Sequence, residues 1–332
     1  MVWTGFKTET DDALTASCPQ ETALPLAPIQ QESEVNLSRG IKESKQTLNL
    51  SLVQEEKPQI QEAIAIIGVS ARFAQSETLQ AYWQNLQAGK NCVGEIPDNR
   101  WPLEGFFVED IDEAIAQRKS YSKWGSFLES FADFDPLFFG IPPRDVLSID
   151  PQERLFLQSS WEALEDAGYT RDTLREKYQQ QVGVFAGITK TGFDLYGPEL
   201  MQRGEAVFPH TSFSSLANRT SYFLNLQGPS MPIDTMCSSA LTAIHEACEH
   251  LRRRDCQLAL AGGVNLYLHP SNYVQMCAMR MLSKDGQCKA FGQGGNGFVP
   301  GEGVGVVLLK PLSEAIRDRD NIHAIIRREQ NR

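Results

Sequence analysis

The feature that most constrains the fold is a set of short apolar runs that recur along the chain between stretches with helical periodicity. AIAIIGV begins at Ala63, and it is followed by QVGVFAG at 181–187, CQLALAGG at 256–263 and VGVVLLK at 304–310. Runs of this length are typical of strands that are buried on both faces of a sheet. Strands that alternate with helices predict an α/β protein with a largely buried sheet.

Two helices have clear boundary signals. The stretch SETLQAYWQNLQAGK at 76–90 predicts a helix with Ser76 as its N-cap. A second helix, PQERLFLQSSWEALEDAG, follows Asp150 as N-cap, has Pro151 at its first position and ends at Gly168. The aromatic segment 101–139 between them predicts a loop-rich insertion whose rings pack together rather than form a ligand cage.

Residues 1–62 differ from the rest of the chain. They hold ten acidic against five basic residues, are rich in Gln, Ser and Thr, and show almost no periodic apolar pattern. This composition predicts a polar, disordered interdomain linker. We therefore expect a globular domain over 63–327, followed by an atypical end at 328–332.

The charge balance bears on partners and compartment. The chain has 42 acidic and 31 basic residues, a formal net charge of −11, and no long Lys/Arg block. We therefore expect no binding to nucleic acid or to an anionic membrane surface. No run of about 18 apolar residues and no secretory signal is visible, which predicts a soluble, cytoplasmic protein.

Cysteine and histidine usage argues against a metal site. The seven cysteines are scattered without a CxxC pair, and the five histidines form neither HExxH nor a Cys/His cluster. We expect reduced thiols and no bound metal.

Residues 228–255 read as a turn, a strand, a sharp corner and a helix, with Cys237 at the start of the helix. Leu241, Ile244, Cys248 and Leu251 share one side of that helix. Unpaired N–H groups and the helix dipole favour a thiolate there and can stabilise an oxyanion. Cys237 is therefore a candidate acyl-accepting nucleophile. The alternative, a small buried hydrophobe, is equally compatible with the pattern.

The glycine-rich stretch FGQGGNGFVPGEGVGVV at 291–307 contains GxGxxG, but the strand follows the loop instead of preceding it. A dinucleotide-binding turn is therefore excluded. We expect this backbone to approach something closely, with the Cys237 pocket as one candidate and a long hairpin-like connection as the alternative.

The charged residues near Cys237 have simpler interpretations than catalysis. We predict that His245 and His250 are solvated on the polar face of the helix, and that His210 caps a local turn. The run Arg252 to Arg254 is expected to complement a helix C-terminus rather than to bind phosphate.

From Ala63 onward the chain resembles the ketosynthase (β-ketoacyl synthase) domain of modular polyketide synthases, within the thiolase-like superfamily. GITKTGFDLYGPEL and FGQGGNG further resemble assembly lines served by trans-acting acyltransferases. The matching segments are IAIIGVSARF at 64–73, FDPLFFGIPPRDVLSIDPQERLFLQSSWEALEDAGY at 134–169, VGVFAG at 182–187, NRTSYFLNLQGPSMPIDTMCSSAL at 218–241 and GFVPGEGVGVVLLKPL at 297–312.

The resemblance implies a thiolase-like fold of α-β-α-β-α layers, of which this chain holds the first half plus the aromatic insertion. It also implies that Cys237 accepts an acyl chain from the 4'-phosphopantetheine of an acyl carrier protein, and that its backbone N–H forms part of the oxyanion hole. A malonyl-type extender is then decarboxylated and attacks the thioester. Acyl carrier proteins, indirectly a trans-acting acyltransferase, and a homodimer are the expected partners, with no directly bound cofactor.

The catalytic histidines of the family, in HGTGT-like and GH motifs, are not found in the sequence, and His323 in IHAIIR has the wrong context to replace them. We therefore expect an amino-terminal fragment that lacks condensation and is able at most to be acylated on Cys237. The alternatives are a non-catalytic fragment for carrier docking or dimer formation, and a thioester hydrolase or thiolase.

Overall fold

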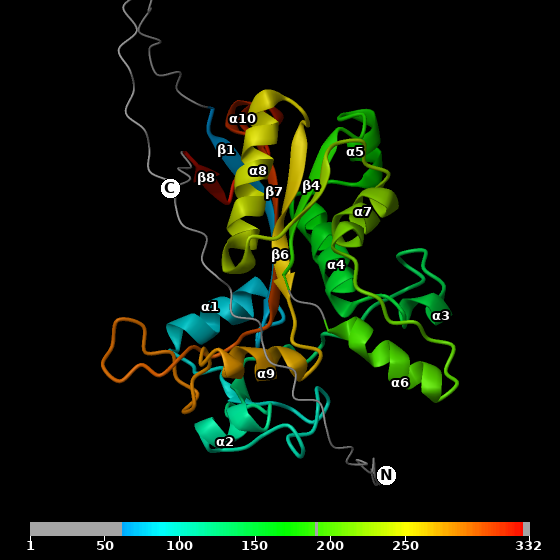
Figure 1. The fold of residues 1–332 in the computed structure, drawn as a ribbon. Helices are drawn as coiled ribbons and strands as arrows, with labels where there is room; N and C mark the ends of the chain where they lie inside the picture. Colours follow the sequence, from blue (N-terminus) through cyan, green and yellow to red (C-terminus); the bar gives the residue numbers. More distant parts are fainter. Residues whose placement is uncertain (1–61, 190–191, 328–332) are drawn as a thin grey trace, which may run out of the picture. The chain divides into compact units, whose positions relative to one another are not determined.

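The computed structural model describes residues 62–189 and 192–327 (Figure 1). These residues all belong to one compact unit, Pro58–Arg332. The predicted linker, apart from Glu62, and the segment 328–332 lie outside the described residues. The domain boundaries therefore stay predictions.

The centre of the domain is a six-stranded sheet in the order β5-β4-β6-β7-β1-β8. Strands β5, β4 and β6 are mutually parallel, and β7 runs antiparallel to both of its neighbours, β6 and β1. The four apolar runs form the four central strands, which confirms the predicted buried sheet. The strands are β1 (Ile64–Phe73), β4 (Val182–Gly187), β5 (Ser230–Ile233), β6 (Leu258–Asn265), β7 (Gly303–Pro311) and β8 (Ala324–Ile326).

Alternate residues of the central strands enter two separate apolar cores, as the two-residue period of a strand requires. In β6, Leu258 and Leu260 face one core, while Ala259 and Ala261 face the other. The side chains that β6 presents on the second face are therefore smaller, and a helix can pack closer to this strand there.

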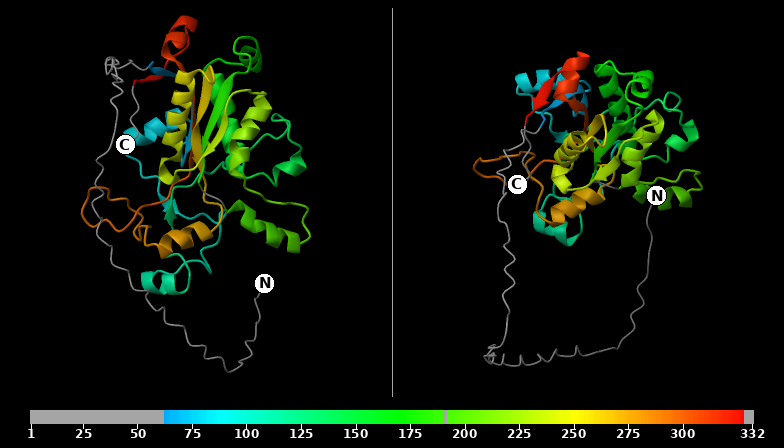
Figure 2. Two further views of the ribbon diagram at one scale, coloured as in Figure 1. Left: turned by 45° about the horizontal axis from the view of Figure 1, so that its top comes forward. Right: turned by 90° about the horizontal axis from the view of Figure 1, so that it is seen from above.

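Helices cover both faces of this sheet (Figures 1 and 2). Helix α8 (Ser239–Arg253) covers the face with the smaller residues, and α4 (Pro151–Asp166), α5 (Arg171–Glu176), α7 (Phe213–Leu224) and α10 (Leu312–Asp318) cover the other. The result is a three-layer α-β-α arrangement. Helix α4 is buried along most of its length, and both of its predicted ends are confirmed. The Asp150 carboxylate accepts the Gln152 N–H at 2.8 Å, and Gly168 has a φ of 72°.

The predicted start of helix α1 (Leu79–Gln87) was wrong. Its N-cap is Thr78, whose hydroxyl accepts the Ala81 N–H at 3.2 Å. Ser76 is instead buried, and its backbone N–H and C=O both pair with Phe73. Ser76 and Thr78 both carry a hydroxyl group that could cap the helix. The backbone pairing of Ser76 with Phe73 leaves Thr78 as the cap. Helix α1 buries none of its residues.

A third apolar core lies beyond the sheet and contains Trp101 and Tyr121, which confirms that these rings pack. It draws on the insertion 91–149 and on helix α9 (Ser271–Ala278). Phe138, in the same insertion, is half exposed. The shorter elements of this part of the chain are β2 (Gly94–Glu95), α2 (Ile111–Ala116), β3 (Trp124–Gly125), α3 (Pro143–Val146), η1 (Phe193–Tyr196) and α6 (Gly197–Gln202).

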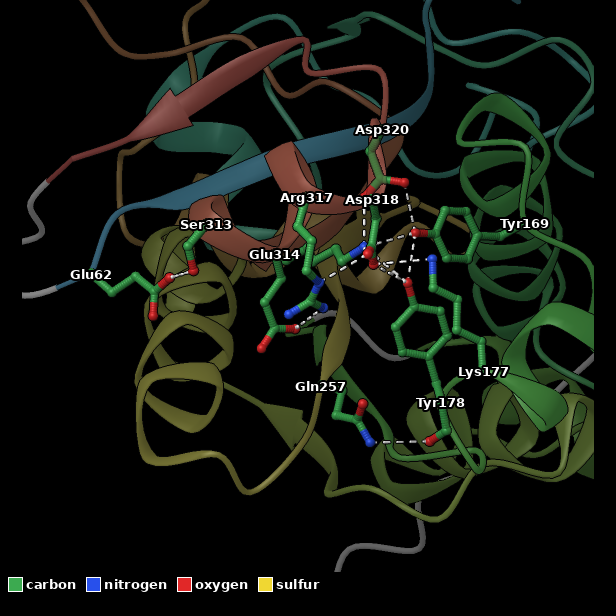
Figure 3. A network of polar contacts seen from close by, with 11 residues as sticks. Glu62, Tyr169, Lys177, Tyr178, Gln257, Ser313, Glu314, Arg317, Asp318 and Asp320 are labelled. Carbon is green, nitrogen blue, oxygen red and sulfur yellow. Dashed lines mark hydrogen bonds and ion pairs between the residues drawn. The ribbon is translucent and has the colours of Figure 1, made fainter.

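Near the end of β7, the Lys310 ammonium is fully buried. The residues around it form a polar network, of which Tyr169, Tyr178, Asp318 and Asp320 are labelled in Figure 3. The Lys310 Nζ lies 2.6 Å from carboxylate oxygens of both Asp318 and Asp320, 2.9 Å from the Tyr178 hydroxyl and 3.1 Å from the Tyr169 hydroxyl. These partners come from the ends of α4, α5 and α10. The network therefore ties three helices to one strand.

The charged forms of Lys310 and Asp318 stabilise each other. Burial acts to raise the pKa of Asp318, but hydrogen bonds from Lys310, Lys177 and Arg317 outweigh it and hold that pKa well below its usual range. Burial acts to lower the pKa of Lys310, but hydrogen bonds with its two carboxylate partners raise it overall. Because the folded pKa of Asp318 is depressed, its stabilising contribution is present above the ordinary value of about 3.9 and is lost as the pH falls below it.

Lys310→Met is expected to lower the free energy of unfolding at pH 7 by about 3 kcal/mol, because it removes the buried cation that Asp318 and Asp320 share. Urea denaturation followed by circular dichroism measures the loss. The variant should also lose less stability than the native chain between about pH 5 and pH 2, since its Asp318 is no longer stabilised as an anion by Lys310.

The matched control is Lys177→Met. The Lys177 side chain is 47% exposed and lies 3.0 Å from Asp318. Exposed ion pairs contribute about 0–1 kcal/mol, so this variant should change little. Equal losses in the two variants would contradict the role assigned to Lys310.

Candidate active site

Cys237 lies in a sharp corner between β5 and α8, within the short 3₁₀ turn η2 (Met236–Ser238). Its side chain is exposed and lines a cavity of about 640 Å³. The corner lies at the carboxyl-terminal ends of the parallel strands β4, β5 and β6, where open α/β sheets bind their ligands. The prediction that Cys237 lies at the start of a helix is confirmed, with one 3₁₀ turn leading into α8.

Hydrogen bonds hold this corner in an unusual backbone conformation. Met236 has a φ of 58°, in the left-handed region that costs a non-glycine residue about 1 kcal/mol. The Asp234 carboxylate accepts the Met236 N–H at 3.0 Å and the Thr189 hydroxyl at 2.8 Å. The Ser239 hydroxyl accepts the Thr235 N–H at 2.9 Å and donates to the Met236 carbonyl at 2.7 Å. Side chains on both sides of Cys237 therefore fix its direction.

Two glycines allow the start of α8 to approach the sheet. A Cβ on Gly187, the last residue of β4, would lie 2.8 Å from the Ala240 nitrogen. A Cβ on Gly263 of β6 would lie 2.9 Å from the Ala240 Cβ. No side chain fits at either position without displacing the helix, so the height of Cys237 above the sheet depends on these glycines.

The glycine-rich stretch 291–307 makes two different approaches. A Cβ on Gly297 would lie 2.3 Å from the Leu282 backbone, away from Cys237. Gly301, Gly303 and Gly305 line the Cys237 cavity itself. The expected approach to the Cys237 pocket is therefore confirmed for the second part of this stretch. Strand β7 follows the loop instead of preceding it, which agrees with the exclusion of a dinucleotide-binding turn.

A buried ion pair that the sequence did not suggest supports this cavity wall. The carboxylate of Glu302 lies 2.6 and 3.2 Å from two guanidinium nitrogens of Arg100, and both side chains are almost fully buried. The same carboxylate accepts the backbone N–H groups of Leu128 and Tyr267, each at 2.9 Å. The Arg100 guanidinium also lies 3.5 Å from the centre of the Phe131 ring. The one signal for this ion pair in the sequence was a glutamate inside a glycine-rich loop with no basic residue beside it.

Helix α8 packs differently from the sequence prediction. Cys248 and Leu251 are buried as expected, but Leu241 is 74% exposed. Ile244 is partly buried against the same core, and Ala243 and Ala247 complete the contact with the sheet. These small residues face the small residues of β6, so the close approach of helix and sheet, rather than side-chain size, decides which positions are buried.

Two histidine predictions were wrong. His250 is not solvated: its Nδ1 lies 2.8 Å from the Asp255 carboxylate and its ring is 5.1 Å from the Phe185 ring. His210 does not cap a helix, because Ser212 occupies that position and the His210 Nδ1 lies 3.3 Å from the Phe208 carbonyl oxygen. His250 was misjudged because Phe185 comes close to it only in the folded chain, whereas the partner of His210 lies two residues away.

The C-terminal turn of α8 carries Arg252 and Arg253, which confirms the expected complement to its dipole. Within residues 62–189 and 192–327, no group of three His, Cys, Asp or Glu side chains could hold a metal ion. No helix in that part of the chain is long and apolar enough to cross a membrane.

The fold and the site together define an α/β protein that presents a cysteine on a strand-turn-helix corner at the edge of a mixed sheet. Residues 61–315 match the family described as β-ketoacyl synthase, N-terminal domain. The chain therefore belongs to the β-ketoacyl synthase family.

The relatives of known sequence include polyketide synthases. The chain is 51% identical over 265 residues to polyketide synthase ThaG of Burkholderia thailandensis, covering 80% of this chain and 5% of ThaG. It is 43% identical over 327 residues to polyketide synthase PksL of Bacillus subtilis, covering 97% of this chain and 7% of PksL. The chain thus spans a small part of the curated relatives it matches.

Solved structures show the same fold. The oxazolomycin ketosynthase domain OzmH KS7 of Streptomyces albus superposes with a TM-score of 0.75 at 45% identity, over 80% of this chain and 44% of that one. The module 6 ketosynthase of the bacillaene synthase of Bacillus subtilis gives 0.70 at 44% identity, over 80% and 43%. These matches confirm the predicted thiolase-like fold.

Gly263→Ala is expected to displace the start of α8, which should lower the free energy of unfolding by about 1–3 kcal/mol and slow alkylation of Cys237 severalfold. Urea denaturation measures the first effect. Peptide-resolved mass spectrometry after timed treatment with iodoacetamide measures the second, because it separates Cys237 from Cys288, which is also exposed.

Gly94→Ala is the control, since an added Cβ at that residue of β2 meets no atom within 4 Å. It should leave both the stability and the rate near the native values. A Gly263→Ala variant with native stability and native Cys237 reactivity would show that the close approach does not set the geometry of the corner.

Proposed function

We propose that this chain is the nucleophile-bearing part of a ketosynthase of polyketide biosynthesis. In this proposal Cys237 accepts an acyl chain from the 4'-phosphopantetheine of an acyl carrier protein. A malonyl-type extender on a carrier protein then loses carbon dioxide, and its carbanion attacks the acyl-Cys237 thioester. The observation that carries the proposal is the exposed Cys237 thiol on a rigid corner inside a cavity.

The backbone around Cys237 suits acyl transfer. Among the hydrogen bonds between described residues, the N–H groups of Met236, Ser238 and Ser239 all have acceptors, whereas the N–H of Cys237 has none. An unpaired N–H beside the sulfur can donate to the oxyanion that forms when the thiolate attacks a thioester carbonyl. We therefore assign the Cys237 N–H to the oxyanion hole.

The cavity suits an acyl chain. The apolar side chains of Phe73, Ile188, Met236 and Val264 line it together with glycine backbone. A chain that enters here reaches Cys237 without displacing a charged group, because the one carboxylate in the wall, Glu302, already binds Arg100. Delivery on a phosphopantetheine arm needs no cofactor bound to the chain itself.

The remaining partners follow from the family. We propose that a trans-acting acyltransferase loads the extender, on the basis of the segments 187–200 and 291–297, and that residues 1–62 connect this domain to a neighbouring one. Among the described cysteines no disulfide is formed, which supports a reducing, cytoplasmic location.

Incubation of the chain with an acyl N-acetylcysteamine thioester is expected to acylate Cys237, and intact-protein followed by peptide mass spectrometry detects the adduct. The adduct should be lost in Cys237→Ala and kept in Cys288→Ala, which removes the other exposed thiol within residues 62–189 and 192–327. An adduct that follows Cys288, or no adduct on folded protein, would rule out Cys237 as the acyl acceptor.

One observation favours a second role, the formation of a dimer around this domain. Strand β5 forms an edge of the sheet, and an edge strand presents backbone groups that a second strand can pair with. Beside it, Tyr222 on α7 is 89% exposed, and a hydrogen bond of 2.9 Å between Ser221 and Ser230 holds α7 to β5. We propose a second copy of this chain as the occupant of this edge, because an isologous contact places two identical edges antiparallel.

Sedimentation velocity across a range of concentrations should reveal a dimer of the native chain. Tyr222→Glu should shift it to monomer, because it places a charge in the proposed contact. Phe291→Glu is the control, since Phe291 is fully exposed elsewhere on the domain and its replacement should leave the dimer intact. A native chain that is monomeric throughout, or equal effects of both variants, would refute this interface.

A further inference from the structure

Tyr267 places a polar group inside the Cys237 cavity that the proposed acyl transfer does not use. It follows directly after β6, lines the cavity and is 5% exposed. The other polar side chains of the wall are committed to the structure. Thr189 and Ser239 hold the corner, and Glu302 binds Arg100. The Asn265 carboxamide donates to the Gly301 carbonyl at 2.8 Å. Tyr267 is left facing the space that an acyl chain would fill.

Tyr267 and Cys237 line the same cavity, and their side chains are close enough for the phenol and the thiol to interact electrostatically. On its other side the Tyr267 ring meets the Tyr273 ring edge-on, with centroids 5.4 Å apart. Tyr273 donates its own hydroxyl to the Trp124 carbonyl at 3.1 Å, away from the cavity. Tyr267 and Tyr273 can therefore be compared directly, because Tyr267 lines the cavity and Tyr273 does not.

The backbone that carries Tyr267 is held on both sides. Its N–H donates to the Glu302 carboxylate at 2.9 Å, and the preceding N–H of Leu266 donates to the Gln152 carboxamide at 3.2 Å. Glu302 is in turn fixed by Arg100. A polar group held in this way cannot move aside for an apolar ligand without breaking buried hydrogen bonds, which is the condition for selectivity.

The phenol keeps its proton and can donate it. Burial raises the pKa of Tyr267, so the group is neutral at physiological pH. The neighbouring Asn265 carboxamide acts in the opposite sense on this pKa. The Tyr267 hydroxyl forms no hydrogen bond with another residue in the part of the chain that the structure describes, so its O–H is available to a group inside the cavity.

We infer that Tyr267 is a specificity-determining residue that favours acyl chains with a hydrogen-bond-accepting oxygen close to the thioester over saturated chains. This inference rests on the proposed acylation of Cys237. A saturated chain leaves the phenol O–H without a partner in an otherwise apolar cavity, whereas an oxygen substituent accepts it. Sites that hydrogen bond a substrate oxygen discriminate against the analogue that lacks it. Because the cavity is open to water, we expect a preference of about tenfold rather than the larger factors of closed sites.

The test compares the N-acetylcysteamine thioesters of 3-hydroxybutanoic and butanoic acid on the full 332-residue chain. In each reaction the Cys237 sulfur bonds to the acyl carbon, the bond from that carbon to the N-acetylcysteamine sulfur breaks, and the released thiol takes up the proton that Cys237 loses. Timed peptide mass spectrometry gives the acylation rate at Cys237 for each ester.

The native chain should react about ten times faster with the hydroxylated ester, and Tyr267→Phe should bring the ratio of the two rates close to one. Tyr273→Phe is the matched control and should keep the native ratio, since its phenol lies outside the cavity. A ratio readout separates selectivity from structural damage, because a distorted site slows both esters together.

Two results would overturn the inference. One is a native chain that is acylated without preference, and the other is a Tyr267→Phe variant that keeps the native ratio or loses both rates equally. In either case acylation of Cys237 itself stands. A native chain that reacts with neither ester overturns the proposed function, and the inferred selectivity with it.

Discussion

The structure depends on one close contact, between the start of α8 and the ends of β4 and β6. Gly187 and Gly263 leave no space for a Cβ there, and Ala240 of the helix fills the gap. The same requirement for small residues continues along the interface, where Ala243 and Ala247 of α8 face the alanines of β6. Because the helix lies this low on the sheet, the turn before it must be sharp. The left-handed Met236 and the outward direction of Cys237 follow from that turn.

Strand β7 is the second element on which the site depends, and it is anchored at both ends by buried charges. Glu302 binds Arg100 just before the strand, and Lys310 binds Asp318 and Asp320 at its other end. Burying charges is costly, and these pairs offset the cost with several hydrogen bonds each. A network of this kind tolerates one arrangement only, so it fixes where β7 begins. The glycines that line the cavity lie at that beginning.

The cavity lies where two cores meet, with the sheet and α8 on one side and the aromatic core on the other. Tyr267 belongs to the aromatic core and also lines the cavity. The insertion around 101–139 packs against Tyr267 in that core and supports the cavity wall from behind without lining the cavity itself. Family membership explains the cysteine and its corner. The character of the opposite wall is a property of the residues this particular chain places there, and its buried phenol is the polar group best placed to distinguish one acyl chain from another.

The sequence by itself determined what depends on short-range pattern. Apolar runs identified the four central strands, and Asp150, Pro151 and Gly168 marked the ends of α4. The strand-turn-helix pattern of the sequence placed Cys237 at the start of a helix. Motif resemblance added the family and the fold. The pattern could not show that Thr78 rather than Ser76 caps α1, that Leu241 is exposed or that the His250 ring packs against Phe185, because each outcome depends on a packing neighbour.

Only the tertiary structure could reveal the Arg100–Glu302 pair, whose members are 202 residues apart, or place the Tyr267 phenol in the cavity that Cys237 lines. The physical reason is that periodicity and capping act within a few residues, whereas buried charge pairs and cavity walls are made by segments that meet only when the chain folds.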